Sequence, residues 1–465
     1  APERWHAYVL YCLQENMEQD MEEINRFLTQ NLSPARSLRW MRLDNAAKIY
    51  PAAKRRKWNN FFRLSATLCD EVDKTVLRNA MDVTMRRFPS IAVRLCRGAF
   101  WYYLEELSSA PEITDEKSWP LAHTPFESIN ECALRVIVYK NRIAVEFYHA
   151  LTDGTGGMVF LKSLLAEYIE QKYGVEIPNE CGVLDRLTQP QEEELEDSFS
   201  KNAGSVSVSR NATTAFKIHY TPERDDFRHL TTFILDSNAA LAAAKSCGVS
   251  LTVYLTSAML LALQRIQDEQ TPDKRRQKPI RVVVPVNLRR LFPSRTLRNF
   301  VHVIMPEIDP RMGDYEFSEI LTSVKHQLGL LVTKKNLCAM FTPNVNAERS
   351  PLLRVMPLFL KNIAMKLVYD TVGERTNCLN LSNLGDIKVP DAMRRYVTRF
   401  DFILGVQATK PNNCGVLSYN GKLYMNFIRN TVEPVLEFQF YQVLRELGLH
   451  VKVESNGAGN VLIPN

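Results

Sequence analysis

The order of apolar and polar residues predicts alternating strands and helices through the first half of the chain. Residues 62–68 have the pattern of a strand, and residues 70–87 carry apolar side chains at helical spacing. Phe88-Pro89 ends this helix, because a proline disfavours helical conformation in the residue before it. Two hairpins follow, from residues 91–95 with 99–104 and from residues 132–139 with 143–148, and then a helix over residues 156–172.

The second half repeats this mixture. Strands are predicted over residues 230–235, 280–286 and 301–308, and helices over residues 238–246, 252–268 and 317–331. Asn420-Gly421 lies between two apolar runs, which is the strongest short signal for a β-hairpin. Pro434 opens a last helix that ends at Leu447, before Gly448. The pattern therefore predicts an α/β protein with a mixed lobe in each half.

The boundaries of these lobes follow from the stretches where the patterning stops. Residues 1–33 have one apolar stripe and an acidic run, which predicts an appended helical segment. Residues 175–225 combine prolines, a second acidic run and a polar stretch, which is typical of a linker. The expected organisation is thus an N-terminal lobe over residues 34–174 and a C-terminal lobe over residues 226–465.

The composition is ordinary for a soluble globular protein. The 465 residues are 45% hydrophobic and 24% charged, which suits two or three domains. The nine cysteines are scattered without a C-x-x-C pair, so neither a disulfide framework nor a zinc site is indicated, and a cytoplasmic location is expected. No run approaches the roughly 18 apolar residues of a membrane span, and no secretory signal is visible. The net charge of +6 is mild and does not indicate nucleic-acid binding.

The segment 149–154, H-A-L-T-D-G, is the most informative feature for function, because it joins a predicted strand to a predicted helix. A histidine held on a tight loop can accept a proton near neutral pH. Each member also has a simpler explanation. His149 could be a hydrogen-bonded structural residue, Asp153 could cap the following helix, and Gly154 with its neighbours Gly156 and Gly157 could supply positive φ. Their convergence on one loop favours a catalytic site.

Other catalytic patterns are missing from the chain. It has no G-x-S-x-G elbow, no phosphate-binding loop, no G-x-G-x-x-G near Asp153 and no H-E-x-x-H. His149 consequently has no obvious serine partner and no metal to bind. His149 is therefore expected to act as a general base directly on a bound acceptor. No metal and no bound cofactor are expected.

The segment 149–154 resembles the H-x-x-x-D-G signature of the chloramphenicol acetyltransferase-like superfamily, which includes condensation domains and alcohol acetyltransferases. Residues 285–289 and 381–385 resemble two further elements of that superfamily, and residues 40–44 and 418–423 are similar to its alcohol acetyltransferase branch. The resemblance covers about residues 36–450. It implies an α/β fold of two acetyltransferase-like lobes, with mixed sheets flanked by helices, that form a V-shaped pseudo-dimer in one chain.

The resemblance also implies roles for single residues. His149 would take the proton of an acceptor as the acceptor attacks a thioester carbonyl, and no acyl-enzyme would form. Asp153, followed by Gly154, would pair with Arg289 and fix the loop of the base.

Four other positions are assigned to the surroundings of the base. Ser382 and Asn383 are the candidates to stabilise the oxyanion, with a strand-end turn as the alternative role. Asn299 would shape the floor of the channel. Tyr148 replaces the first of two histidines that many members carry. It would alter the packing beside the site or offer its hydroxyl to it.

The expected function is transfer of an acyl group from acyl-CoA, as a co-substrate, to an alcohol or an amine. Two alternatives stay open: a condensation-type enzyme that takes its donor from an acyl carrier protein, and a catalytically silent binding module of the same fold. The expected partners are acyl-CoA and a small acceptor, with no nucleic acid, no membrane span and a monomeric state.

Overall fold

The computed structural model describes residues 39–52, 60–123, 125–208, 213–224, 226–407 and 410–457. The chain divides after Arg39, and the larger of its two parts, Trp40–Asn465, forms one compact unit. The helix predicted for residues 1–33 lies outside the described residues. The fold below is that of the larger unit.

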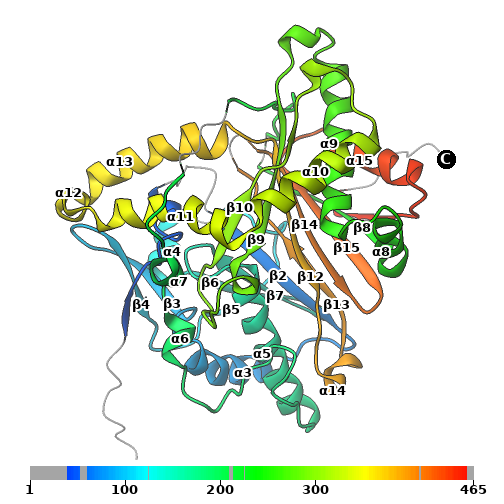
Figure 1. Cartoon of the computed structure of the whole chain (residues 1–465). Helices are drawn as coiled ribbons and strands as arrows, with labels where there is room; N and C mark the ends of the chain where they lie inside the picture. The colour runs from blue at the N-terminus through cyan, green and yellow to red at the C-terminus, as the bar shows by residue number, and fades with distance from the viewer. Residues whose placement is uncertain are drawn as a thin grey trace, which may run out of the picture. The chain divides into compact units, whose positions relative to one another are not determined.

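Strands and helices alternate through the first part of this unit (Figure 1). They are β1 (Trp40–Arg42), α2 (Ile49–Ala52), β2 (Phe61–Leu68), α3 (Lys74–Arg87), β3 (Val93–Arg97), β4 (Tyr102–Glu106), β5 (Ile113–Asp115), α4 (Phe126–Glu131), β6 (Leu134–Tyr139), β7 (Arg142–Tyr148) and α5 (Gly154–Tyr173). Both predicted hairpins and both predicted helices of this half are confirmed. Two short helices, α6 (Glu192–Leu195) and α7 (Ser198–Asn202), lie within the stretch predicted to be a linker.

The second part contributes all eight strands of the larger sheet. Its elements begin with β8 (His229–Asp236), α8 (Ser237–Ser246), α9 (Leu251–Gln270), η1 (Lys274–Arg276), β9 (Ile280–Asn287), η2 (Leu288–Arg290), β10 (Val301–Ile304), β11 (Glu307–Ile308), η3 (Pro310–Met312) and α10 (Phe317–Leu331). They continue with α11 (Lys334–Arg349), α12 (Pro351–Val355), α13 (Leu358–Val368), η4 (Tyr369–Glu374), β12 (Leu379–Asp386), α14 (Asp391–Arg394), β13 (Val397–Ile403), β14 (Asn412–Tyr419), β15 (Lys422–Arg429), α15 (Val435–Glu446) and β16 (Lys452–Ser455).

Two mixed sheets form the framework, and a small third sheet (β1-β4-β3) lies apart from them. The five-stranded sheet has the order β13-β2-β7-β6-β5, and the eight-stranded sheet has the order β10-β9-β12-β14-β15-β8-β16, with β11 on β9. Strand β13 comes from the second half of the sequence but pairs antiparallel with β2 of the first half. The two lobes are therefore connected through a shared strand, which the predicted boundaries did not include.

The large sheet is buried on both faces and contributes side chains to both hydrophobic cores. Along β14, Leu417 and Tyr419 pack into the core of the first lobe, whereas Cys414 and Val416 pack into the core of the second. Successive side chains of a strand point to opposite faces, so one strand serves both cores. All eight residues of β14 are buried for this reason. The hairpin that it forms with β15 turns at Asn420 and Gly421, both with positive φ, as predicted.

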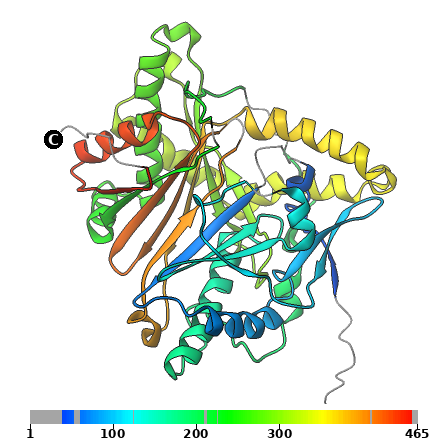
Figure 2. The same cartoon turned by 180° about the vertical axis from the view of Figure 1, so that it is seen from behind.

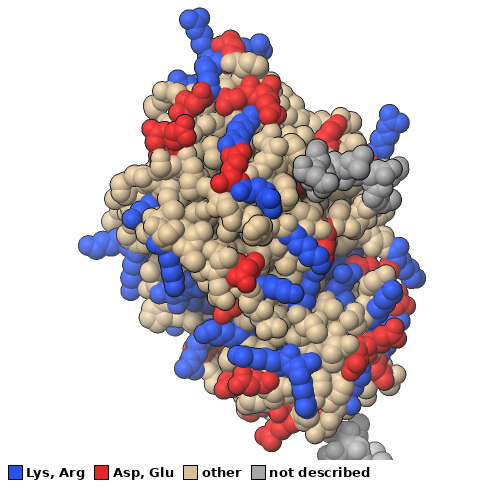
Figure 3. All heavy atoms as spheres, turned by 90° about the vertical axis from the view of Figure 1, so that its right-hand side faces the viewer, with Lys and Arg blue, Asp and Glu red and all other residues tan. Residues whose placement is uncertain are grey.

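Helices cover the sheets (Figures 1 and 2). Helix α9 packs against α10 and α15, and α3 packs against α5. Among the described residues, no single helix has the length and apolarity to cross a membrane; α8 and α9 meet that requirement only as a pair, which is bent by 84°. Basic and acidic side chains are interspersed over the described part of the face in Figure 3.

Candidate active site

His149 lies on a tight turn between β7 and α5. Its backbone N–H donates to Asn60 O at 2.9 Å, and the N–H of Leu151 donates back to Tyr148 O at 2.9 Å. The ring of Tyr50 stacks on the imidazole with 4.6 Å between centroids, and the edge of Phe62 lies 5.0 Å away. The imidazole is therefore held in one orientation by aromatic side chains on two sides.

Asn299 determines which nitrogen of His149 carries the proton. Its Nδ2 donates to His149 O at 3.0 Å and to Asp44 Oδ2 at 3.3 Å, so its Oδ1 must face the imidazole. That oxygen lies 3.2 Å from His149 Nδ1. An amide oxygen can only accept, so Nδ1 carries the hydrogen and Nε2 keeps its lone pair. The neutral ring is thus prepared to accept a proton at Nε2.

Asp44 supports Asn299 from behind. Its carboxylate is inaccessible to solvent, accepts from Ala47 N at 2.7 Å and lies 3.7 Å from Arg298 Nε. Burial raises its pKa to about 6, although the charge of Arg298 opposes this shift. Asp44 belongs to residues 40–44, which resemble the alcohol acetyltransferase branch, but the resemblance assigned no role to it. Its bond from Asn299 Nδ2 helps to hold the amide that contacts His149.

Asp153 does not contact the imidazole but organises the loop around it. Its Oδ1 accepts from Thr155 N and Gly156 N at 3.0 Å each, which caps α5. Its Oδ2 accepts from Arg289 Nη1 and from Phe300 N, at 2.8 Å each. The structure therefore brings Asp153 and Arg289 together, and the same carboxylate holds the segment that carries Asn299.

Close packing against backbone, and not positive φ, requires a glycine at position 156 of this loop, whereas the close contact at Gly154 is with the movable end of a leucine side chain. Neither Gly154 nor Gly156 has a positive φ, which corrects the simpler interpretation of these residues. A Cβ on Gly156 would lie 2.1 Å from Leu297 O, and a Cβ on Gly154 would lie 2.7 Å from Leu384 Cδ2. Thr152, which the sequence did not single out, donates to Leu297 O at 2.6 Å. The loop of His149 thus lies directly against residue 297 and strand β12.

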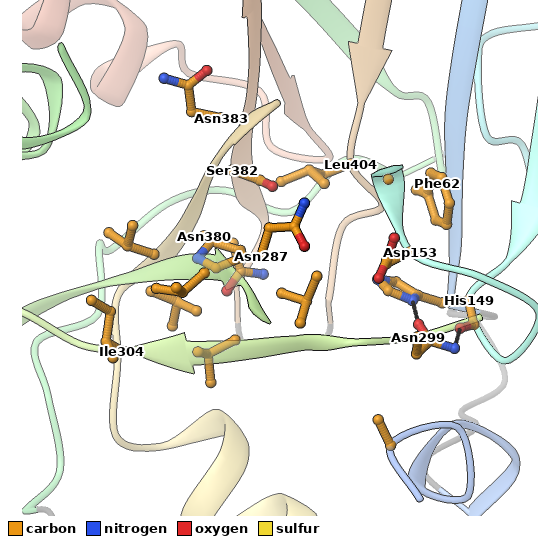
Figure 4. A pocket seen from close by; sticks show the side chains of 18 of the residues that line it. Phe62, His149, Asp153, Asn287, Asn299, Ile304, Asn380, Ser382, Asn383 and Leu404 are labelled. Atoms are coloured by element: carbon orange, nitrogen blue, oxygen red, sulfur yellow. Dashed lines mark hydrogen bonds between the residues drawn. The ribbon is translucent and has the colours of Figure 1, made fainter. Parts of the chain in front are cut away.

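A cavity of about 740 Å³ extends from His149 into the second lobe (Figure 4). Its wall includes the polar side chains of Asn287, Asn380 and Ser382. Another part of its wall is apolar and comes from β9, β10 and α10 and the residues just after them; this part includes Val283, Val301, Val303, Ile304, Leu328 and Val332. Such a cavity can hold a flexible chain while its reacting end lies at His149.

The other predicted site residues, Ser382, Asn383 and Tyr148, differ in how their side chains lie relative to this cavity. Ser382 points into it, and its hydroxyl has no hydrogen-bond partner among the described residues (Figure 4). The amide of Asn383 points away from His149, because its Nδ2 donates to Thr252 Oγ1 at 3.2 Å and its Oδ1 accepts from Gly385 N at 2.8 Å. Asn383 therefore has the strand-end role that was the alternative.

Tyr148 is not part of the cavity wall. It is the last residue of β7 and is not among the described residues that line the cavity. Its ring packs against Phe61 at 5.6 Å, and its buried hydroxyl has no hydrogen-bond partner among the described residues. Of the two roles expected for Tyr148, its position fits packing beside the site and not a hydroxyl offered to the site.

The surroundings of His149 favour its neutral form. Burial among aromatic rings lowers the pKa of His149, and the charge of Asp153 and the bond to Asn299 offset this only in part. No group of three or more His, Cys, Asp or Glu in the described part of the chain could hold a metal ion. The arrangement suits proton transfer by a single imidazole in the wall of the cavity.

No family model and no curated protein matches this chain. Solved structures do. Polyketide synthase associated protein 5 from Mycobacterium tuberculosis is 14% identical, with 88% of this chain and 98% of that chain covered and a TM-score of 0.53. The starter condensation domain of rhizomide synthetase, in complex with C8-CoA, is 12% identical (88% and 94%; TM-score 0.55). Trichothecene 15-O-acetyltransferase from Fusarium sporotrichioides is 13% identical (88% and 94%; TM-score 0.50). At these identities the likeness concerns the fold alone.

Proposed function

We propose that this chain, which has the chloramphenicol acetyltransferase-like fold, is an acyltransferase that moves an acyl group from a coenzyme A thioester to an alcohol hydroxyl. His149 is its general base. The observation that carries the proposal is the bond from His149 Nδ1 to Asn299 Oδ1 at 3.2 Å, because it leaves the lone pair of Nε2 available at the cavity.

The proposed reaction needs no acyl-enzyme. Nε2 of His149 accepts the proton of the acceptor hydroxyl while the oxygen attacks the thioester carbonyl carbon. A C–O bond forms, and the electron pair of the carbonyl moves to its oxygen. When this tetrahedral intermediate collapses, the C–S bond breaks, and the thiolate takes the proton back from the imidazolium. One base thus serves both steps, and a placed base contributes about 10²–10⁴ in rate.

Ser382 is the proposed donor to the oxyanion. Its hydroxyl points into the cavity and is not committed to another described residue (Figure 4). One such donor contributes roughly 3–4 kcal/mol of transition-state stabilisation. Asn383 is not proposed for this role, because both ends of its amide are engaged by Thr252 and Gly385.

Two features support a thioester donor with an acyl chain. The apolar part of the cavity accommodates alkyl groups, and polar side chains, among them Asn287 and Ser382, line the same cavity as His149. Of the structural neighbours, one is an O-acetyltransferase and another is in complex with an acyl-CoA. A donor on a carrier protein is the second candidate, because several neighbours are condensation domains of synthetases.

Thiol release is the direct test. We expect the protein to release coenzyme A from acyl-CoA thioesters only when an alcohol or amine acceptor is present, with a rate that depends on acyl length. Release that requires a carrier-bound donor would favour the second candidate. No release from either donor, with the protein folded, would contradict the proposal and favour a silent binding module.

The pH dependence of kcat/KM provides a further prediction. Burial lowers the pKa of His149 below its usual 6.5, and only the neutral imidazole can act as a base. Activity should therefore remain level as the pH falls to 6.5 and decline only below it. Asp44, with a pKa of about 6, and Asp153 are the nearby acids. Initial rates between about pH 5 and 8 measure the profile, and a decline that begins above pH 6.5 would contradict the assignment.

A further inference from the structure

Helices α12 and α13 expose a row of large apolar side chains. Leu352 and Val355 on α12 are 70% and 67% exposed, and Phe359 and Ile363 on α13 are 57% and 65% exposed. Both helices lie at an edge of the molecule in the two opposite views (Figures 1 and 2). Scattered apolar side chains are normal on a surface, but a contiguous group of this kind marks a site of interaction.

The opposite side of α13 packs against the rest of the protein. The exposed row is therefore the outer face of a helix that is already docked in its own fold. Leu358 and Lys361 are buried. The N–H of Leu358 donates to Ala99 O at 3.0 Å, and Lys361 Nζ donates to Phe100 O at 2.9 Å. The turn between β3 and β4 thus holds the inner side of α13. Phe100 on this turn is itself 49% exposed and enlarges the apolar surface.

The charged side chains of α12 and α13 are all basic. Residues 351–368 contain Arg354, Lys361 and Lys366 but neither Asp nor Glu, while Glu348 and Asp370 lie outside these helices. Arg354 and Lys366 are exposed. Exposed apolar side chains beside Lys and Arg are typical of segments that lie in the interface of an anionic bilayer. Lysine is depleted at protein interfaces, so a lipid surface fits this composition better than a protein partner.

The helix that carries part of the row leads to the cavity. Tyr369 and Gly373 belong to η4, which continues α13 along the chain, and both line the cavity. Leu328 and Val332 line the same cavity. The segment directly after α13 is therefore part of the cavity wall, which connects the surface of this helix to the cavity.

We infer that α12 and α13 dock this protein on an anionic phospholipid bilayer and that its cavity takes a long-chain substrate dissolved in that bilayer. The second half of the inference rests on the proposed acyl transfer; the docking does not. Apolar side chains enter the boundary between headgroups and acyl chains, and Arg354 and Lys366 bind lipid phosphates.

Co-sedimentation of the full chain with vesicles tests the docking without any substrate. One set of vesicles is phosphatidylcholine alone, and the other contains an equal part of phosphatidylglycerol. We expect binding to the anionic set, and a partition coefficient that falls by about tenfold or more in Phe359→Ser/Ile363→Ser. Arg354→Gln/Lys366→Gln should lose about fivefold for each charge on anionic vesicles only. Leu187→Ser is the matched control, because Leu187 is 87% exposed on another surface.

Several outcomes would overturn the docking. These are an absence of wild-type binding, equal binding by Phe359→Ser/Ile363→Ser, or a dimer that this variant converts to a monomer, which would assign the row to a second copy. A fall in melting temperature of the variant with unchanged vesicle binding would show that the row is covered by the protein's own chain. His149→Ala should bind vesicles like the wild type, so a failure of the proposed catalysis is distinguishable from a failure of docking.

Discussion

His149→Ala is expected to lower kcat by about 10²–10⁴-fold with little change in KM. The imidazole is required at the moment of proton transfer, when Nε2 accepts the proton of the acceptor hydroxyl while Asn299 Oδ1 accepts the hydrogen bond of Nδ1–H. Its removal therefore raises the barrier of the chemical step without removing a group that binds substrate in the ground state. Steady-state rates of thiol release, with a saturating acceptor, measure the effect.

A matched variant separates loss of the base from loss of a packed ring. His302→Ala is suitable, because His302 is buried on β10 while its neighbours Val301 and Val303 line the cavity. The ring of His302 packs against the buried ring of Phe341, and His302 is not among the described residues that line the cavity. Both variants remove an imidazole, and only His149→Ala should lose the chemical step. Full activity in a folded His149→Ala would assign the base to another residue.

Local patterning predicted most helices and strands, but not which sheet each strand joins. β14 and β15 were predicted because Asn420 and Gly421 sit between two apolar runs. Strand β13 could not be assigned in this way, since its pairing with β2 connects segments about 330 residues apart. Helices α12 and α13 were not predicted. A helix is recognised in a sequence by apolar residues on its buried face and polar residues on its exposed face, and here several apolar side chains lie on the exposed face.

The candidate site was predictable to the extent that its chemistry is local. His149, Asp153 and Gly154 occur within one hexapeptide, which made them recognisable together. Asn299 and Asp44 could not be given their roles, because they are 255 residues apart and meet only in the folded chain. The orientation of Asn383 depends on Thr252, which is 131 residues away in sequence. Roles that rest on the direction of a side chain thus required the structure.

Asp153→Ala is expected to lower the free energy of unfolding by roughly 3–5 kcal/mol. The carboxylate is buried, and its removal leaves Arg289, whose side chain is 12% exposed, without its anionic partner. The change also removes the cap of α5 and the acceptor of Phe300 N. Activity should fall as well, because the bond from Phe300 N to Asp153 holds the segment that carries Asn299. Urea denaturation gives the free energy, and thiol release gives the rate.

Asp73→Ala provides the control for the cap alone. Asp73 caps α3 by accepting from Thr75 N and Val76 N, which is the same geometry as Asp153 at α5, but it is exposed. Its loss should cost about 1 kcal/mol. The difference between the two variants therefore reports the contribution of the bonds to Arg289 and Phe300. If Asp153→Ala were as stable as Asp73→Ala yet inactive, Asp153 would act directly in the reaction, and its role as a positioning residue would be wrong.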